Sequence, residues 1–284
     1  MAQSTREIKR RIKGIGSTMQ ITKAMELVST AKMRKARIRL DKSRPYYLTV
    51  LDSIGDVINN VNINHPLLRK REVKKSLYIV ATADRGLAGG YNANITRLID
   101  SKFRNKKDSI SLITIGLKGR DFFKSRGYDI VGEFTGISEE PSFSDASEIG
   151  NLAVELFLKG EIDEINVVYT RFITTLSHEP IIIKLLPAEE IRENSKVPKK
   201  VIDFEPSPEE VLDYLIPKYI ESSVFGALIE ASSSEQAARR VAMESATDNA
   251  EEMIEELNMS YNRARQAAIT MEISEIVAGA EALK

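Results

Sequence analysis

The chain has 284 residues, of which 42% are apolar, 29% charged and 6% aromatic. This is enough apolar material for one large domain or two modest ones, while the low aromatic content favours surface-rich helix over a single thick core. Cysteine is absent and only two histidines occur, so disulfides, thiolate nucleophiles and Cys-ligated zinc are excluded, and a histidine-built metal site is disfavoured.

The net charge of zero conceals a strong segregation of charge along the chain. Residues 1–50 contain 13 Lys or Arg against 3 Asp or Glu, whereas residues 205–284 contain 6 against 16. If both ends are helices, charge as well as apolar contact favours their pairing. No segment has the ~20 continuous apolar residues of a membrane-spanning helix, and the N-terminus lacks a secretory apolar core, so we expect a soluble, cytosolic protein.

The N-terminal segment, about residues 4–58, has the apolar spacing of a long helix. Its apolar residues recur at intervals of four, three and four, a narrow stripe typical of a coiled-coil seam: Ile8, Ile12, Ile15 and Met19. Pro45 lies inside this segment and should kink the helix or mark its weakest turn.

The middle of the chain changes to short apolar runs and a period of two. These runs predict strands at residues 76–83, 111–116, 164–172 and 180–187. Helical stretches lie between them, at about 92–104, 118–126 and 145–159. Such alternation predicts a mostly parallel sheet with crossover helices. The polar residues 193–200 are expected to form a loop.

The C-terminal segment predicts a second, even longer helix. It starts after Pro206 and Pro208, which suit the beginning of a helix, and contains no proline after Pro217. A stripe of apolar and small residues continues from Ala246 to Met271 at intervals of three and four, which permits close approach of another helix.

The two helices differ in length, and this predicts an overhang. At ~1.5 Å per residue the first is roughly 80 Å long and the last roughly 110 Å. If they run antiparallel out of the α/β domain, residue 3 lies opposite about residue 263. Residues 266–284 then project alone, and they are apolar over most of the helix circumference. Because a lone helix of this kind is unstable in water, we expect a partner to form a socket around it.

These elements define the expected fold class, which is α/β with long helices. The N- and C-terminal segments form an antiparallel two-helix coiled coil, and a Rossmann-like α/β domain lies between them in the sequence. The expected domains are an N-terminal coiled-coil helix at 1–58, the α/β domain at 59–203, and a C-terminal coiled-coil helix with an apolar tip at 204–284.

The loop at residues 82–92 follows a strand and precedes a helix, where glycines can let backbone amides approach a phosphate. Its glycines, Gly86, Gly89 and Gly90, give the spacing G-x-x-G-G, which matches neither the dinucleotide-binding nor the P-loop pattern. We therefore favour a tight structural turn over a nucleotide site.

No other group of residues indicates catalysis or metal binding. His65 and His178 have no ligand or base at motif spacing, and the paired carboxylates, such as Glu139 with Glu140, lie in polar surroundings that would not raise a pKa. The basic run at 31–40 lacks interleaved aromatic residues, so a solvated face or an acidic protein partner is favoured over nucleic acid. We expect no catalytic, cofactor-binding or metal-binding residue.

Four blocks of sequence are specific enough to indicate a family. They are ITKAMELVSTAKMRKAR at 21–37, DRGLAGGYN at 84–92, SEQAARRVAM at 234–243 with ATDNA at 246–250, and YNRARQAAITMEISEIVAGAEA at 261–282. In these blocks, almost end to end, the chain resembles the gamma subunit of F-type ATP synthases. Ala88 departs from the many relatives that have cysteine there, so thiol control is excluded.

The resemblance implies a central stalk that rotates on the axis of a ring of three alpha and three beta subunits, with one gamma subunit per complex. Its foot would dock on the membrane-embedded c ring, and an epsilon subunit would be a further partner. Catalytic sites belong mainly to beta in this family, so the chain would not be an enzyme by itself. It would couple ion flow to ATP synthesis or hydrolysis and regulate both. It would be peripheral on the cytoplasmic face of a bacterial cell membrane, held there only through the complex.

The resemblance also implies roles for individual residues. Contact with beta is implied for Lys23, Met25, Arg265, Gln266, Thr270 and Glu272. Enclosure of the tip by an apolar sleeve of the ring is implied for Ile276, Val277 and Leu283. Contact with the c ring is implied for Phe204 and Glu205.

Two other classes of protein remain as alternatives. An ATP-dependent RNA-binding enzyme with a coiled-coil arm should contain phosphate-binding and catalytic motifs, and none is found. A cytoskeletal or scaffold coiled coil should show heptads on both ends and needs no apolar overhang. The sequence does not distinguish protons from sodium ions as the coupling ion.

Overall fold

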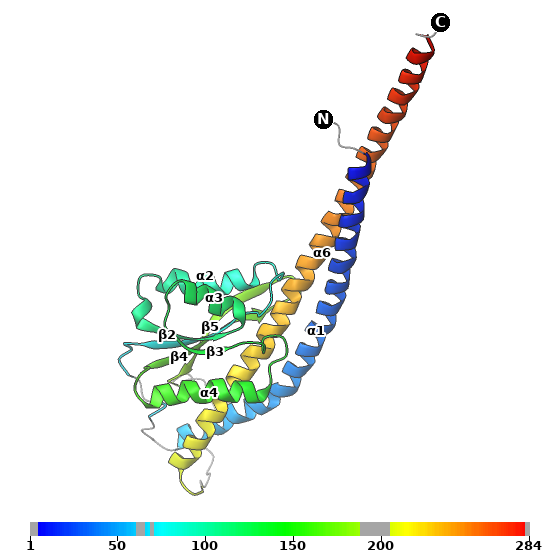
Figure 1. Cartoon of the computed structure of the whole chain (residues 1–284). Coiled ribbons are helices and arrows are strands. Elements are labelled where there is room, and N and C mark those ends of the chain that lie inside the picture. Colours follow the sequence, from blue (N-terminus) through cyan, green and yellow to red (C-terminus); the bar gives the residue numbers. More distant parts are fainter. Residues whose placement is uncertain (1–4, 61–65, 69–70, 188–204, 282–284) are drawn as a thin grey trace. The chain divides into compact units, whose positions relative to one another are not determined.

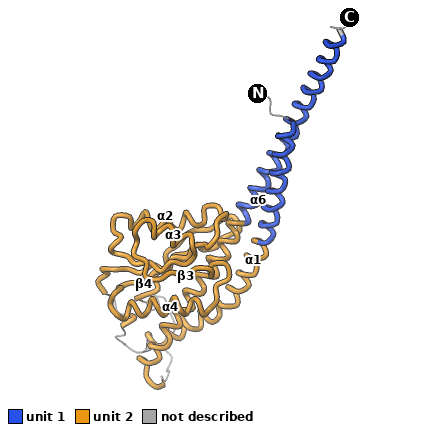
Figure 2. Tube along the Cα trace, in the orientation of Figure 1, with its two compact units in different colours: residues 1–28, 240–284 blue, residues 29–239 orange. Residues whose placement is uncertain are grey.

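The computed structural model describes residues 5–60, 66–68, 71–187 and 205–281 (Figure 1). The predicted loop at 193–200 lies outside this part of the chain. The chain divides into two compact units (Figure 2). We call residues 1–28 with 240–284 the helical unit, and residues 29–239 the sheet unit. Both boundaries fall inside long helices, because α1 is Thr5–Asn60 and α6 is Pro208–Glu281.

The two long helices form where the apolar stripes predict them. Helix α6 begins at Pro208 with Glu209 and Glu210 in its first turn, where carboxylates favour the helix dipole. The hydroxyl of Ser207 accepts a hydrogen bond from the Glu210 N–H at 3.2 Å and so caps this end. Pro45 lies within α1, and the helix continues past it. Among the described residues, no helix is long and apolar enough to cross a membrane.

The sheet unit contains one five-stranded sheet in the order β3-β2-β1-β4-β5. Its strands are β1 Ser76–Ala81, β2 Ile110–Ile115, β3 Ile130–Phe134, β4 Glu164–Phe172 and β5 His178–Leu186. The pairs β1–β2, β2–β3 and β1–β4 are parallel, and β4–β5 is an antiparallel hairpin. The predicted, mostly parallel sheet is therefore confirmed, but the sequence interpretation missed β3.

Helices cover both faces of the sheet, as crossover connections require. They are α2 Tyr91–Phe103, α3 Leu117–Ser125 and α4 Phe143–Leu158. Along β1, Leu77 and Ile79 face a core completed by α4 and by the sheet-unit parts of α1 and α6. Tyr78 and Val80 face the opposite core, which is built with α2 and α3 (Figure 1). The side chains of β1 thus alternate between a face covered by α4 and the long helices and a face covered by α2 and α3.

In the helical unit, α1 and α6 pair side by side and run antiparallel (Figure 2). The hydroxyls of Thr22 and Thr247 lie 2.8 Å apart, and Ile8, Met243 and Ala250 are buried. Since the helices are antiparallel, this contact puts the first described residue of α1 opposite about residue 264. Every residue from 265 to 280 is exposed. The predicted overhang is confirmed for the described part of the chain.

Candidate functional site

The residues with a predicted beta contact lie in two patches on the helical unit. On α1, Lys23 is exposed and Met25 is half-buried. The four on α6 are all exposed: Arg265, Gln266, Thr270 and Glu272. In the antiparallel register Lys23 lies opposite about residue 246, so the two patches are about 30 Å apart along the helix axis. The structure therefore does not bring them together, and each would need its own contact on a partner.

The apolar tip consists of five exposed side chains on the overhang: Ile269, Met271, Ile273, Ile276 and Val277. Two of them were predicted, and they are strongly exposed, Ile276 at 67% and Val277 at 54%. Leu283 lies outside the described residues. Exposed apolar groups of this size on successive turns mark a surface that a partner covers.

The residues with a predicted c-ring contact precede α6. Glu205 is exposed and lies three residues before Pro208, where α6 begins. Phe204 lies outside the described residues. An exposed carboxylate at this position is accessible to a polar partner.

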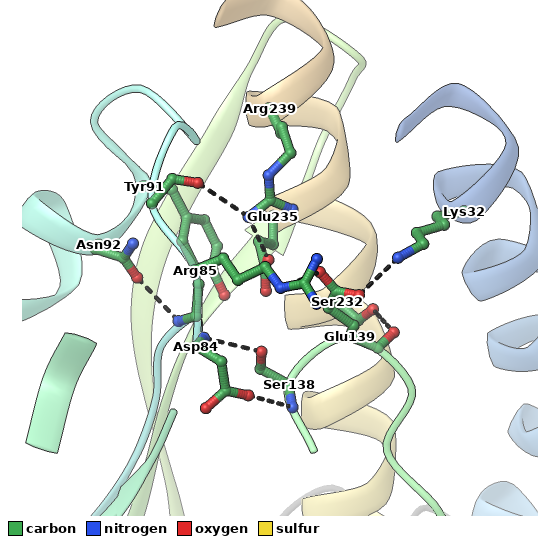
Figure 3. A network of polar contacts seen from close by, with 12 residues as sticks. Lys32, Asp84, Arg85, Tyr91, Asn92, Ser138, Glu139, Ser232, Glu235 and Arg239 are labelled. Carbon is green, nitrogen blue, oxygen red and sulfur yellow. Dashed lines mark hydrogen bonds and ion pairs between the residues drawn. The ribbon is translucent and has the colours of Figure 1, made fainter. Parts of the chain in front are cut away.

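A second candidate site lies wholly within the sheet unit, where both long helices meet the loops after β1 and β3 (Figure 3). We call it the polar junction and define it by Lys32 on α1, Asp84 and Glu139 in the loops, and Glu235 and Arg239 on α6. These loops follow the carboxyl ends of parallel strands, which is where functional residues gather in α/β sheets.

Asp84 ties three loops together at this edge of the sheet. Its carboxylate accepts hydrogen bonds from the backbone N–H groups of Leu117 at 3.1 Å, Gly136 at 2.9 Å and Ser138 at 3.2 Å. Its own N–H donates to the Ser138 hydroxyl at 3.0 Å (Figure 3). Burial opposes ionisation of Asp84, but these hydrogen bonds outweigh it and hold its pKa below the ordinary value.

Ion pairs fasten the loop after β3 to α1. Lys32 Nζ lies 2.6 Å from a carboxylate oxygen of Glu139, and Lys35 pairs with Glu140 at 2.7 Å. Burial alone would raise the pKa of Glu139, but its hydrogen bond to Lys32 and the nearby cations lower it. Glu139 is also joined to α6, because its carbonyl accepts a hydrogen bond from the Ser232 hydroxyl at 2.7 Å.

On α6 the junction contains a buried ion pair. Glu235 and Arg239 lie one helical turn apart, their side chains are 1% and 6% exposed, and they are joined at 2.7 Å. Arg239 also donates to the carbonyl of Gly86 at 3.3 Å, and the Tyr91 hydroxyl donates to the Ala231 carbonyl at 3.2 Å. Burial raises the pKa of Glu235, and the charge of Arg239 offsets part of this rise.

The loop at 82–92 therefore connects the sheet to α6. Gly86 contributes its carbonyl to Arg239, while Leu87 and Gly89 adopt positive φ of 62° and 53°. Asn92 accepts a hydrogen bond from the Ala83 N–H at 2.9 Å, which closes the turn before α2. This is the tight structural turn that the glycine spacing favoured.

The two histidines were the remaining chemical candidates. His178 begins β5, and His65 lies outside the described residues. Within residues 5–60, 66–68, 71–187 and 205–281, no three His, Cys, Asp or Glu side chains gather as a metal site would require.

Comparison with known proteins assigns this arrangement to a family. A family model described as ATP synthase matches residues 4–283. An ATP synthase gamma chain of Alkaliphilus metalliredigens is 57% identical over the full length of both chains. A sodium-ion-specific ATP synthase gamma chain of Acetobacterium woodii is 47% identical, again over all of both chains. This chain belongs to the ATP synthase gamma chain family.

Two solved structures of ATP synthases contain chains similar to this gamma-family chain. A chain in the central stalk and c ring of the Tetrahymena thermophila mitochondrial ATP synthase is 27% identical, with a TM-score of 0.62 over 80% of this chain and 99% of that one. A chain of the Euglena gracilis mitochondrial ATP synthase has a TM-score of 0.72 over 98% of this chain and 94% of that one. At 21% identity the latter supports the fold alone.

The polar junction is the part of this gamma-family chain that sequence reasoning missed. Glu139 and Glu140 were considered only as a carboxylate pair in polar surroundings, and Lys32 only as part of a basic face. The basic charge of α1 correctly indicated acidic partners for this helix. The sequence analysis, however, looked for those partners in the acidic C-terminal helix. The partners of Lys32 and Lys35 are instead in the loop after β3.

Replacement of Asp84 by Asn should destabilise this gamma-family chain in a pH-dependent way. The amide keeps one acceptor oxygen but removes the charge that draws three N–H groups, so we expect a loss of about 1–3 kcal/mol at pH 7. The pKa of Asp84 is lower in the folded chain than in the unfolded chain. The ionised carboxylate therefore gives its full contribution to the free energy of unfolding above the ordinary pKa, and this contribution is lost as the pH falls through the folded-state pKa. Urea unfolding of the variant and the unaltered chain, at pH 7 and again below pH ~4, measures the loss of stability at each pH. An equal loss at both pH values would contradict the assigned role of the charge.

Proposed function

We propose that this chain is the rotary central-stalk subunit of an F-type ATP synthase. Its antiparallel helices form a shaft on the axis of a ring of three alpha and three beta subunits, and it couples rotation of a membrane-embedded c ring to ATP synthesis or hydrolysis in that ring. The observation that carries the proposal is the exposed apolar end of α6, residues 265–280, in a chain of the gamma family.

The proposed mechanism is conformational and gives the chain no catalytic role of its own. A stiff, asymmetric shaft presents a different face to each beta subunit as it turns, and the difference in contact free energy shifts each beta site among open, loose and tight states. Catalysis then belongs to the ring. The charge asymmetry of the shaft, basic in residues 1–50 and acidic in residues 205–284, supplies the different faces.

We assign the predicted contacts within this mechanism. The patches at Lys23 and Met25 and at residues 265–272 meet beta, the apolar tip lies in the sleeve of the ring, and residues 204–205 approach the c ring. An epsilon subunit is a further partner. The chain is peripheral on the cytoplasmic face of a bacterial cell membrane through these contacts. No feature of the described residues favours the RNA-binding alternative.

A subunit count tests the proposal directly. The tagged chain, purified gently from its own cells, should bring down alpha and beta subunits, and quantitative mass spectrometry should give one copy per three of each. A complex that contains RNA and no alpha or beta subunits would favour the RNA-binding enzyme instead. A chain that purifies alone under conditions that keep the ring intact would count against a place on its axis.

Replacement of Met25 by Lys tests the first contact patch. Met25 is half-buried on α1 next to the exposed Lys23, so the variant puts a second cation beside the proposed beta contact. We expect ATP-driven ion pumping by the assembled complex to fall while ATP hydrolysis continues. A matched control is Ser17→Lys, which adds the same charge at an exposed position of α1 about two helical turns from Met25. Equal pumping by both variants and the unaltered complex would remove Met25 from the contact.

A further inference from the structure

A cavity of about 340 Å³ lies inside the sheet unit, between α1, α6 and the β4–β5 hairpin. Its wall contains Tyr47 from α1, Tyr169 from β4, Leu185 from β5, and Gly226 and Glu230 from α6. This volume lies at the lower end of the range for small-ligand sites, and the mixture of apolar walls with a few polar groups is typical of them. None of the contacts proposed above uses this cavity.

Small residues on α6 create the space. Over the two turns that face the cavity, α6 presents only short side chains: Ser222, Ser223, Gly226 and Ala227. A Cβ atom added at Gly226 would meet nothing within 4 Å. The opposite walls are large and apolar, since Tyr169 and Leu185 are buried in the core beneath the long helices. These short side chains therefore leave open space between α6 and the sheet.

The polar groups of the cavity are arranged around one carboxylate. A Glu230 side-chain oxygen accepts a hydrogen bond from the Phe172 N–H at 3.1 Å, which positions it at the end of β4. Burial raises the pKa of Tyr169, and the charge of Glu230 and a hydrogen bond to it raise it further. The tyrosine hydroxyl is therefore protonated and can donate to Glu230. On the α1 side, Asp41 and Arg44 are both exposed at the rim.

These charges favour a cation over an anion. One partly buried carboxylate, Glu230, lines the cavity, while Asp41 and Arg44 are both exposed at the rim, where solvent screens their opposite charges alike. Tyr47 and Tyr169 line the cavity, and aromatic rings can stabilise a nearby cation. An anionic ligand inside the cavity would have to place its negative charge near the carboxylate of Glu230. If the ligand kept that charge in water instead, its apolar body would also stay outside the cavity.

We propose that this cavity is a binding site for a small organic cation with an apolar body. Its ammonium group pairs with Glu230, and its body lies against Tyr47, Tyr169 and Leu185. Such a ligand touches α1, α6 and the β4–β5 hairpin at once, so it stabilises the packing of the long helices on the sheet. This inference does not depend on the central-stalk role.

Three probes with the same body and different head groups test the proposal: phenylbutylamine, phenylbutanol and phenylbutyrate. Titration calorimetry on the full chain should show that the amine binds about tenfold more tightly than the alcohol, which is the factor expected for a charge-assisted hydrogen bond. The butyrate should bind more weakly than both. Binding of the butyrate as tight as that of the amine, or no binding of the amine, would overturn the proposal.

Two variants locate the binding. Glu230→Gln keeps an acceptor for the Phe172 N–H but removes the charge, so the amine should bind only as tightly as the alcohol. Gly226→Leu fills the cavity and should abolish binding of all three probes. If that variant does not fold, Ile183→Trp closes the cavity from β5, where the side chain is 38% exposed and tolerates enlargement.

A matched carboxylate provides the control. Glu155→Gln removes an exposed charge from α4, outside the cavity, and should leave the affinity for the amine unchanged. Equal loss of amine binding in Glu155→Gln and Glu230→Gln would show a general charge effect and would overturn the site. Retention of binding in a folded, cavity-filled variant would overturn it as well.

Discussion

Removal of residues 271–284 should leave the sheet unit intact and strongly impair the assembled complex. The described part of this segment is exposed, and in the helical unit it makes no buried contact that its loss could break. Burial of Met271, Ile273, Ile276 and Val277 in a partner contributes roughly 1.5–3 kcal/mol for each side chain. We therefore expect association with the ring to weaken more than tenfold, and ATP-driven ion pumping to fall with it.

The measurement compares two quantities on the same truncated chain. Thermal unfolding of the truncated chain without its partners measures the stability of the sheet unit. The unfolding midpoint should match that of the full-length chain. The amount of alpha and beta subunits recovered with the chain after reconstitution measures how well the helical unit associates with the ring. As a control, Ile276→Ser with Val277→Ser keeps the helix length and removes part of the apolar surface, so it should give an intermediate defect. Loss of the sheet unit on truncation would show that the helix end supports the fold, contrary to its exposure.

Arg239→Ala should cause the largest loss of stability among single substitutions in the polar junction. It leaves Glu235 with its side chain 1% exposed and without its cation. Removing one member of a buried ion pair costs about 3–5 kcal/mol, because the remaining charge is neither solvated nor neutralised. Denaturant unfolding of the full chain at pH 7 measures the effect.

The loss should shrink as the pH is lowered. Burial already raises the pKa of Glu235, and removal of Arg239 removes the charge that opposes this rise. A carboxyl group with a raised folded-state pKa destabilises the protein increasingly as the pH rises above its unfolded-state pKa, and it costs least where it is protonated. The loss of unfolding free energy in Arg239→Ala, relative to the unaltered chain, should therefore be larger at pH 7 than near pH ~5.

Two further variants separate charge from packing. Glu235→Gln combined with Arg239→Met removes both charges and keeps similar volumes, so most of the lost stability should return. Lys159→Ala breaks an exposed pair with Glu155 on α4 and should leave the unfolding midpoint unchanged. If the double variant is no more stable than Arg239→Ala, the pair acts through shape and not through charge.

Helices and strands whose apolar residues recur at a regular spacing were predictable from the sequence. Strand β4 occupies the predicted residues, and the predicted crossover helices lie within a few residues of α2, α3 and α4. The overhang was predictable because it depends only on helix length and direction. These features are local or follow from a count of residues, so one sequence is enough to derive them.

Strand β3 was not predictable for a local reason. It is short, only partly buried, and interrupted by Gly132 and Glu133. A Cβ atom at Gly132 would lie 2.9 Å from Leu152 and 3.3 Å from Ile113, so the glycine lets α4 approach the strand closely. In a sequence, a glycine in such a run indicates the end of a strand as readily as a close approach.

The polar junction was not predictable because its contacts join distant parts of the chain. Lys32 and Glu139 are 107 residues apart, and Arg239 and Gly86 are 153 apart. No spacing rule relates them, and each residue taken singly resembles an ordinary surface charge. The same applies to the cavity, since the small residues on α6 match a close helix contact as well as an empty space.

The three hydrogen bonds to Asp84 have a consequence for how the sheet opens. Edge strand β3 has few buried side chains, so its own burial would allow it to detach from β2 independently. The loop after it, however, is held by a carboxylate that also holds the loop after β2 and belongs to the loop after β1. Separation of β3 with its loop must therefore break the hydrogen bonds from Gly136 and Ser138 to Asp84, which couples the opening of this edge strand to the loop after β1.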